Sequence, residues 1–310
     1  MIGTVTLNPC IDRTVVIPSL AVGDMNRMTS SRRDASGKGI NVSIALSDLG
    51  TAVRSCGFIF EDGRDFLISS LRRKGIEMEG ITVQGALREN IKILDEKSRL
   101  TTEINQSGEY VSEDKWEAFI DFFRQFVDGL DLLVLSGSVP PGIPKSAYKD
   151  LMGIASESGV PVFLDAEGEL LLEGLEERPL MIKPNLYELR RTFGCSADSP
   201  EAVIKEAELI RKRYGVEYAF VSLGSLGAVL SCGDGAYIAD PLRVDVRSAQ
   251  GAGDAFVAGV SKAYADGLDA IGMLSCGMAA SASAIEKEGT EMCDALSFSA
   301  HLPTVRIREV

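Results

Sequence analysis

The chain has 310 residues, of which 45% are hydrophobic and 25% charged, and its formal net charge at pH 7 is −13. This composition is typical of a folded protein with one large domain or two smaller ones, and it does not fit a disordered chain. The acidic balance argues against a nucleic-acid partner, whose phosphates need a basic surface. No apolar run approaches the ~20 residues of a membrane helix, so we expect no membrane partner.

The rare residue types exclude two reaction classes. His301 is the one histidine, which leaves almost nothing for a Ser-His-Asp triad or a histidine-rich metal site. The six cysteines form no C-x-x-C pair, and the chain opens on a strand-like run instead of a charged segment and an apolar signal core. We therefore expect a cytoplasmic protein in a reducing compartment.

The first elements place polar residues after an apolar strand. Residues 2–7 predict a buried strand that Pro9 ends, with Asp12 just beyond it. Ligands of parallel α/β sheets bind at the carboxyl ends of strands, so Asp12 is a candidate ligand. Residues 13–34 are polar and β-like, and they include Arg27.

A glycine turn, Gly37-Lys38-Gly39, then leads into an amphipathic helix that contains Asn41. It is not a Walker A loop, because Arg32 stands at the place of the first glycine and Gly39 replaces the Ser/Thr. Lys38 and Asn41 are candidates to hold a phosphate and a hydroxyl. A simple helix start explains the same residues equally well.

Residues 76–106 predict β segments of an exposed sheet. Alternation places Arg88, Asn90 and Lys92 on one face of a strand. The following helical pattern, near 116–130, is assigned to core packing alone.

Three later apolar runs, near 131–135, 180–183 and 216–223, predict further buried strands of a parallel sheet. Their ends carry, in this order, Gly137, then Lys183 with Asn185 and Glu188, and then Ser222 with Gly224 and Gly227. Asn185 and Glu188 have capping-box spacing, a structural role that is compatible with contacts to the waters of a bound metal.

The stretch Gly251-Ala252-Gly253-Asp254 opens an apolar helix. Its glycines let the backbone approach a ligand, and the free N–H groups and dipole of the helix start favour an anion. Asp254 would repel that anion unless it takes a proton, although an ordinary first-turn acid is the competing interpretation. The last long helix, near 270–286, is rich in small residues that either allow close helix packing or leave room for a purine.

Taken in order, these motifs resemble the ribokinase-like (PfkB) carbohydrate kinases, and more narrowly the branch with 1-phosphofructokinase and tagatose-6-phosphate kinase. The resemblance spans nearly the whole chain. Its motifs are Thr6-Leu7-Asn8-Pro9 with Asp12, Gly37-Lys38-Gly39-Ile40-Asn41-Val42, Arg88 with Asn90, Ser136-Gly137-Ser138-Val139-Pro140-Pro141-Gly142, Lys183-Pro184-Asn185 with Glu188, Ser222-Leu223-Gly224, and Gly251-Ala252-Gly253-Asp254.

The resemblance implies a three-layer α/β/α fold in one domain over residues 1–310. Segments near 11–33 and 86–106 would form a small β lid that also serves as a homodimer contact. The implied activity is ATP-dependent phosphorylation of a hexose phosphate, foremost fructose 1-phosphate to fructose 1,6-bisphosphate. Tagatose 6-phosphate as acceptor and a catalytically silent sugar-phosphate sensor are the alternatives. A nicotinamide dehydrogenase is disfavoured, because Phe256 takes the place of the third glycine of its motif.

The resemblance also implies roles for single residues. Asp254 would be the base, and the N–H groups of the turn Gly251, Ala252 and Gly253 would stabilise the transferring phosphoryl group. The implied sugar-phosphate ligands are Asp12, Arg27, Gly37, Lys38, Gly39, Asn41, Arg88, Asn90 and Gly137, with Arg27, Lys38 and Arg88 on the phosphate. The implied ATP ligands are Lys183, Asn185, Glu188, Ser222, Gly224 and Gly227, with Glu188 acting on Mg²⁺ through water.

Three positions depart from the family pattern. Ser36 stands where a glycine is usual, Gln250 precedes the glycines of the helix start where a smaller residue is usual, and Glu167 replaces the serine of a D-x-S-G motif. None of them is the proposed base or a phosphate ligand. Activity is therefore expected to survive, and substrate preference is left open.

Overall fold

The computed structural model describes residues 1–310 and contains fourteen β-strands. They are β1 (Ile2–Thr6), β2 (Cys10–Ile17), β3 (Ser30–Ser36), β4 (Val53–Asp62), β5 (Met78–Ala86), β6 (Arg88–Asp95), β7 (Thr101–Ile104), β8 (Leu132–Ser136), β9 (Val162–Asp165), β10 (Met181–Ile182), β11 (Tyr218–Ser222), β12 (Ala228–Cys232), β13 (Gly235–Ala239) and β14 (Ile307–Glu309).

Ten α-helices and two short 3₁₀ turns accompany the strands. They are α1 (Lys38–Asp48), α2 (Arg64–Arg73), α3 (Glu113–Phe126), α4 (Ala147–Glu157), α5 (Gly168–Leu175), α6 (Leu186–Phe193), α7 (Pro200–Tyr214), η1 (Gly224–Leu226), α8 (Ala252–Ala265), α9 (Ala270–Ile285), α10 (Ala295–His301) and η2 (Leu302–Thr304). No helix has both the length and the apolar character needed to cross a membrane.

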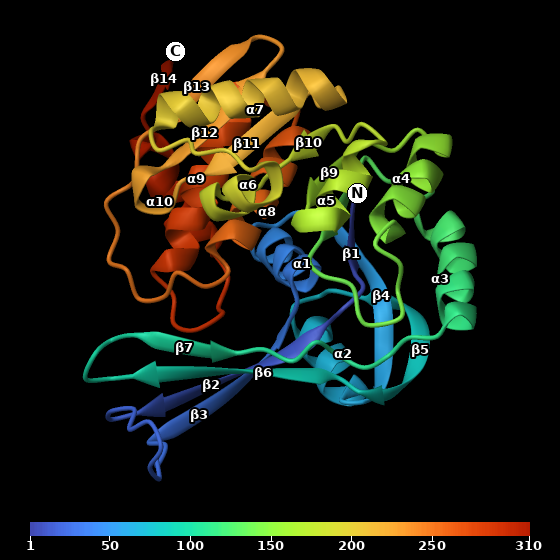
Figure 1. The fold of residues 1–310 in the computed structure, drawn as a ribbon, viewed down its shortest axis with the longest axis vertical. Coiled ribbons are helices and arrows are strands. Elements are labelled where there is room, and N and C mark those ends of the chain that lie inside the picture. Colours follow the sequence, from blue (N-terminus) through green and yellow to red (C-terminus); the bar gives the residue numbers. More distant parts are fainter.

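The larger sheet has the strand order β14-β13-β12-β11-β10-β9-β8-β1-β4-β5 (Figure 1). Its strands from β5 across to β11 are parallel, as expected from the apolar runs. A parallel sheet is covered on both faces, which explains the continuous apolar sequence of β8. Strands β12, β13 and β14 extend the sheet in antiparallel fashion. They are short and interrupted by glycine turns, so periodicity alone does not predict them.

Alternate side chains of the larger sheet enter two separate hydrophobic cores. In β8, Leu133 and Leu135 join the core beneath α3 to α7, whereas Leu132 and Val134 join the core beneath α1, α8, α9 and α10. Figure 1 shows these two sets of helices on opposite sides of the sheet. The expected three-layer α/β/α fold is confirmed.

A second sheet of four strands, in the order β3-β2-β6-β7, projects from one end of the molecule (Figure 1). We call it the lid sheet; its strands lie within residues 10–36 and 88–104, close to the expected segments. Asn90 and Lys92 of β6 are buried, while Ile91 and Ile93 lie on its other face. The expectation of an exposed sheet therefore holds for one face, because the other covers a cavity.

Helices α8 and α9 approach closely because glycines lie at their contact. A Cβ added to Gly259 would lie 2.3 Å from the carbonyl oxygen of Cys276, and one added to Gly277 would lie 2.9 Å from the ring of Phe256. Of the two interpretations of the small residues in α9, close helix packing is the one that the structure supports.

Two glycine substitutions test this packing. Gly259→Ala should lower the free energy of unfolding by about 1–3 kcal/mol, because its methyl group meets backbone atoms that cannot move away. Gly153→Ala in α4 is the matched control, since no atom lies within 4 Å of its added Cβ. It should raise the free energy of unfolding by about 0.5–1 kcal/mol through helix propensity. Urea unfolding measures the free energy of unfolding of both variants. If Gly259→Ala stabilised the protein as much as Gly153→Ala, the packing argument would be contradicted.

Candidate active site

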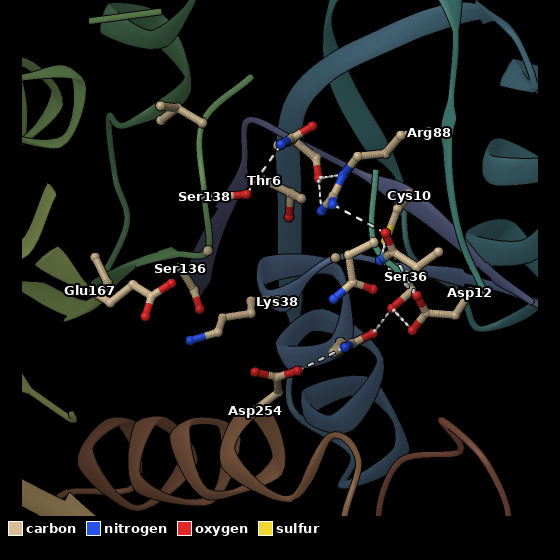
Figure 2. Close-up of a pocket in the computed structure, with 18 of the residues that line it drawn as sticks. Thr6, Cys10, Asp12, Ser36, Lys38, Arg88, Ser136, Ser138, Glu167 and Asp254 are labelled. Carbon is tan, nitrogen blue, oxygen red and sulfur yellow. Dashed lines mark hydrogen bonds between the residues drawn. The ribbon is translucent and has the colours of Figure 1, made fainter. Parts of the chain in front are cut away.

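A cavity of about 570 Å³ lies between the lid sheet and the carboxyl ends of β1, β8 and β9 (Figure 2). It collects side chains from elements that are far apart in the sequence. Of the predicted site residues, it is lined by Asp12, Gly37, Lys38, Asn41, Arg88, Asn90, Gly137, Gly251 and Asp254.

Gly251 forms the turn that starts α8. Its φ is +72°, in the left-handed region that favours glycine, and an added Cβ would lie 2.4 Å from the Met292 methyl group. The N–H groups of Ala252 and Gly253 belong to the first turn and have no partner within the helix. They form a ready site for an anion, and the ammonium of Lys183 lies beside Gly253, 3.6 Å from where a Cβ would be.

Asp254 is buried in the same turn, with 8% of its surface exposed. The side-chain amide of Asn41 donates a 2.7 Å hydrogen bond to its Oδ2. This contact leaves Oδ1 as the oxygen that can accept a proton from a substrate. Burial raises the pKa of Asp254 to about 6, against the lowering effect of the nearby Lys38 charge. A carboxylate with this pKa is ionised at neutral pH and basic enough to act as a general base.

Lys38 points to the centre of the site (Figure 2). Its Nζ lies 3.5 Å from Asp165 and 3.6 Å from Glu188. Burial disfavours its charge, but the carboxylates of Asp165, Glu188 and Asp254 outweigh this effect and raise its pKa. Lys38 therefore stays an ammonium. Its contacts lie with these carboxylates, whereas we had expected it beside Arg88.

A second lysine completes this cluster. Lys183 is 3% exposed, and its Nζ lies 3.2 Å from Oδ1 of Asp165. Burial opposes the charge of Asp165, yet Lys183 and Lys38 hold the pKa of this carboxyl below its usual value. Ser136 also donates a 3.0 Å hydrogen bond to its Oδ2. One buried carboxylate thus holds two lysines at the start of α8.

The protein offers few oxygens for a metal ion. No group of three or more His, Cys, Asp or Glu side chains is placed to hold a metal. Oδ1 of Asp165 is buried with the Lys183 ammonium, at 3.2 Å, as its one partner, and Oε1 of Glu188 lies beside Lys38. These single oxygens fit a Mg²⁺ ion that keeps most of its waters and binds chiefly to nucleotide phosphates.

The other expected nucleotide ligands follow the neighbouring strands β10 and β11. A bridge between Asn185 and Ser222 brings the two strand ends together. The predicted capping box is confirmed, since Asn185 and Glu188 exchange two 2.8 Å hydrogen bonds. Lys183, Asn185, Glu188, Ser222, Gly224 and Gly227 adjoin the carboxyl edge of the sheet but do not line the cavity itself.

Arg88 lies across the cavity from Asp254 (Figure 2). Its guanidinium donates to the carbonyl oxygens of Asn8 and Gln106, at 2.9 and 3.0 Å, and it has no carboxylate within 4 Å. Arg88 thus differs from the paired lysines Lys38 and Lys183. Its charge is available to an anionic ligand.

Comparison with known proteins agrees with this geometry. Residues 5–295 match the family described as pfkB family carbohydrate kinase. The chain belongs to the pfkB family of carbohydrate kinases. It is similar to 1-phosphofructokinase of Bacillus subtilis, with 33% identity over 84% of this chain and 86% of that protein, and to 1-phosphofructokinase of Escherichia coli, with 34% identity over 84% and 82%.

Solved structures show the same fold. A possible 1-phosphofructokinase of Thermotoga maritima has a TM-score of 0.91 and 29% identity, covering 100% of this chain and 99% of that one. Phosphofructokinase-2 of Escherichia coli, in complex with substrates and products, has a TM-score of 0.93 and 25% identity, covering 98% of both chains. This protein is thus a sugar kinase, and the predicted family and fold are confirmed.

Two of the predicted sugar-phosphate ligands lie away from the cavity. Arg27 is exposed on the outer face of the lid sheet, beside Met28 and Ile93. Within one chain, the structure does not bring it together with Arg88. Gly39 lies behind the cavity wall, where an added Cβ would be 2.4 Å from the carbonyl oxygen of Val5. Close packing alone explains the glycine at this position.

The three departures from the pfkB pattern all line the cavity. Ser36 donates a 2.8 Å hydrogen bond to Asp12 and lies 3.2 Å from Oδ1 of Asn41. Gln250 donates a 3.0 Å hydrogen bond to Glu103 of the lid sheet. Glu167 lies close enough to Lys38 for its charge to raise the lysine pKa. Each departure thus makes a contact or interaction of its own.

The cavity also contains polar residues that the sequence did not single out as ligands. They are Lys92, Glu103, Asn105, Lys145 and Arg191, among others. Lys92 carries a usable signal, because strand alternation already placed it on the face of Arg88 and Asn90. Lys145 and Arg191 carry none, since loop and helix-surface cations are usually solvated.

The acid side of the pH profile tests the assignment of Asp254. Because the base must be deprotonated, kcat/KM for the sugar should fall about tenfold per pH unit below about 6. Lys38→Met removes a charge that lowers this pKa, so its acid limb should move to higher pH. Asp254→Asn should lower kcat by at least ~10² and abolish the limb. An unchanged limb in either variant would contradict the assignment, with circular dichroism checking that both stay folded.

Proposed function

We propose that this kinase transfers the γ-phosphoryl group of ATP to the free primary hydroxyl of fructose 1-phosphate, which gives fructose 1,6-bisphosphate and ADP. The two curated relatives are both named 1-phosphofructokinase and match over most of their length. This similarity favours fructose 1-phosphate over tagatose 6-phosphate as the acceptor.

One observation carries the proposal: a single cavity has a free base at one side and an unpaired cation at the other. Asp254 offers Oδ1 at the start of α8, and Arg88 offers its guanidinium across the cavity. A hexose phosphate has its phosphate and its distal primary hydroxyl at opposite ends. Such a molecule would place its phosphate on Arg88 and its hydroxyl on Asp254.

The transfer step follows from this placement. The hydroxyl proton passes to Oδ1 of Asp254 as the hydroxyl oxygen forms a bond to the γ-phosphorus. The bond from that phosphorus to the oxygen bridging to the β-phosphate breaks, and its electron pair leaves with ADP. Negative charge on the transferring group would be stabilised by the N–H groups of Ala252 and Gly253.

Lys38 and Lys183 would flank the transferring group. Both are held by Asp165 and therefore do not have to be reorganised during the reaction. We propose that Lys38 acts on the transferred phosphoryl group, since its contacts join it to Asp165 and Glu188. The phosphate already on the sugar would then depend on Arg88.

The nucleotide would lie along the ends of β10 and β11. Lys183, Ser222, Gly224 and Gly227 would line this side, and Asn185 and Glu188 would lie near Mg²⁺, Glu188 through water. When bound, Mg²⁺ neutralises charge on the nucleotide phosphates. We further propose a cytoplasmic location, because all six cysteines are free thiols and a reducing compartment keeps them so.

Activity with a set of possible acceptor sugars tests the proposed function. The wild-type protein is assayed for ADP release with fructose 1-phosphate, tagatose 6-phosphate, fructose 6-phosphate and unphosphorylated fructose. We expect the highest kcat/KM with fructose 1-phosphate. Arg88→Ala should raise KM for the sugar phosphate roughly 10- to 100-fold, the worth of a charge-assisted contact, and leave KM for ATP nearly unchanged.

Each other outcome has a defined meaning. A higher kcat/KM with tagatose 6-phosphate would mean that this sugar, and not fructose 1-phosphate, is the acceptor. If sugar phosphates bind but none is phosphorylated, the protein would instead be a sugar-phosphate sensor. An equal rise of both KM values in Arg88→Ala would mean that Arg88 does not serve the sugar side.

We also propose that residues 1–310 form one domain whose lid sheet mediates a homodimer. The outer face of the lid sheet gathers Val15, Ile17, Leu20, Met28, Ile91 and Ile93. The connection between β2 and β3 adds exposed apolar side chains, with Val22 93% and Met25 76% exposed. An apolar face of this kind fits a second copy of the same face, as in an isologous dimer. A dimer would also bring Arg27 to the boundary between two chains.

Ile93→Asp should therefore give a monomer in analytical ultracentrifugation, because it places a charge in the proposed contact. Leu209→Asp is the matched control: Leu209 is an exposed apolar residue of α7, away from the lid sheet, and its change should leave the dimer intact. If Arg27 contacts the sugar phosphate bound to the partner chain, then losing Arg27 and losing the dimer should have the same effect. Arg27→Ala and Ile93→Asp should then raise the KM for the sugar phosphate by similar factors. A monomeric wild-type protein would refute the dimer.

A further inference from the structure

Asp12 lies on the inner face of the lid sheet, in the wall of the cavity, with 3% of its surface exposed. Its Oδ2 accepts hydrogen bonds from Lys92, at 2.7 Å, and from Ser36, at 2.8 Å. Its Oδ1 accepts from Asn90, at 3.1 Å, and from the Cys10 thiol, at 3.6 Å. Figure 2 shows Cys10, Ser36 and Asp12 gathered at this side of the cavity.

Four donors thus surround the two carboxylate oxygens of Asp12. An ionised carboxylate has about four lone-pair sites and no proton to donate. Burial and the nearby Asp12 charge raise the pKa of Cys10 to about 12, so the thiol keeps its proton and remains a donor. Asp12 is therefore held in place by the protein, and a sugar hydroxyl that contacts it would replace or share the weak thiol contact of Cys10.

Lys92 has more free hydrogen-bonding capacity than Asp12. It is 7% exposed, lines the same cavity, and makes its one hydrogen bond to Asp12. An ammonium group carries three N–H donors, so two remain without a partner in the protein. Buried donors without partners are unfavourable, and a ligand in the cavity would satisfy them.

The charge of Lys92 decides which ligand oxygen suits it. Asp12 neutralises the ammonium at 2.7 Å, so Lys92 offers hydrogen bonds more than net charge. Arg88, on the same strand, has no carboxylate partner and suits the phosphate better. A neutral hydroxyl is the acceptor that fits the Lys92–Asp12 pair.

We infer that Lys92 is a substrate-binding residue, which donates hydrogen bonds to a ring hydroxyl of the sugar phosphate, and that Asp12 acts as a positioning residue for Lys92. This inference rests on the proposed function. It assigns recognition of the sugar ring to β6, the strand that also carries Arg88 for the phosphate.

The first test is Lys92→Met, which keeps the length of the side chain and removes its donors. The kcat/KM for fructose 1-phosphate should fall roughly 10- to 100-fold, mainly through KM, with KM for ATP unchanged. Lys97→Met is the matched control, since Lys97 is exposed in the turn that follows β6. It should leave both KM values at the wild-type level.

Loss of Lys92 leaves a buried carboxylate unpaired and can destabilise the fold. The double variant Asp12→Asn, Lys92→Met removes both charges together and guards against this outcome. If Lys92 serves only to neutralise Asp12, the double variant should have the same KM for fructose 1-phosphate as Asp12→Asn alone. If Lys92 binds the sugar, the KM of the double variant should be clearly higher than that of Asp12→Asn.

Acceptors that each lack one ring hydroxyl give the decisive measurement. For one of these analogues, wild type and Lys92→Met should have equal kcat/KM, because the hydroxyl that Lys92 would contact is already absent. Whichever of the two Lys92 variants folds is used. The same loss with every analogue overturns the inference, as does a loss confined to phosphorylated sugars, which would place Lys92 on the phosphate.

The wild-type protein separates the two proposals. If it phosphorylates none of the sugar phosphates, the proposed function fails and the inference fails with it. If it is active and the Lys92 variants match it, the inference alone is refuted.

Discussion

The pairing of two lysines with one buried carboxylate is the interaction on which the rest of the site depends. Asp165 contacts Lys38 through one carboxylate oxygen and Lys183 through the other. Asp165 and Lys183 are both buried, and each charge would be costly to bury without the other. Their positive charge lets Asp254 remain ionised in a buried position at neutral pH. The same burial keeps Asp254 basic. A carboxylate that is basic enough for the proposed proton transfer and a positive environment beside it thus arise from one cluster of charges.

The electrostatic potential in the cavity depends on the charged groups nearest to it and not on the net charge of the chain. The chain carries a net charge of −13, yet the cavity contains a guanidinium, that of Arg88, without a carboxylate partner. Backbone carbonyls hold Arg88 in place, so it is oriented without being neutralised. An acidic protein can therefore bind an anionic sugar phosphate, because the field within a buried cavity depends on the nearest groups and is poorly screened by solvent.

The lid sheet uses the two faces of a strand for two purposes. In β6, Asn90 and Lys92 face the cavity, and Ile91 and Ile93 lie on the outer face. A side-chain period of two makes this division unavoidable once the strand is in register. The proposed substrate contacts and the proposed dimer contact are therefore coupled, because a change in the position of the lid sheet moves both faces together.

Local sequence patterns were sufficient to predict the fold class and the place of each motif relative to its strand or helix. Apolar runs that end in glycine or polar residues predict parallel strands and their ligand edge. The same kind of pattern placed Asp254 in the first turn of a helix, predicted the capping box at Asn185, and put Arg88 and Asn90 on one face of a strand. Which charges meet depends on the tertiary structure. Lys38 pairs with Asp165, which is distant in the sequence, Asp12 accepts hydrogen bonds from three strands, and Arg27 lies outside the cavity. Such pairings depend on how separate strands are ordered in the two sheets, which periodicity within one segment does not encode.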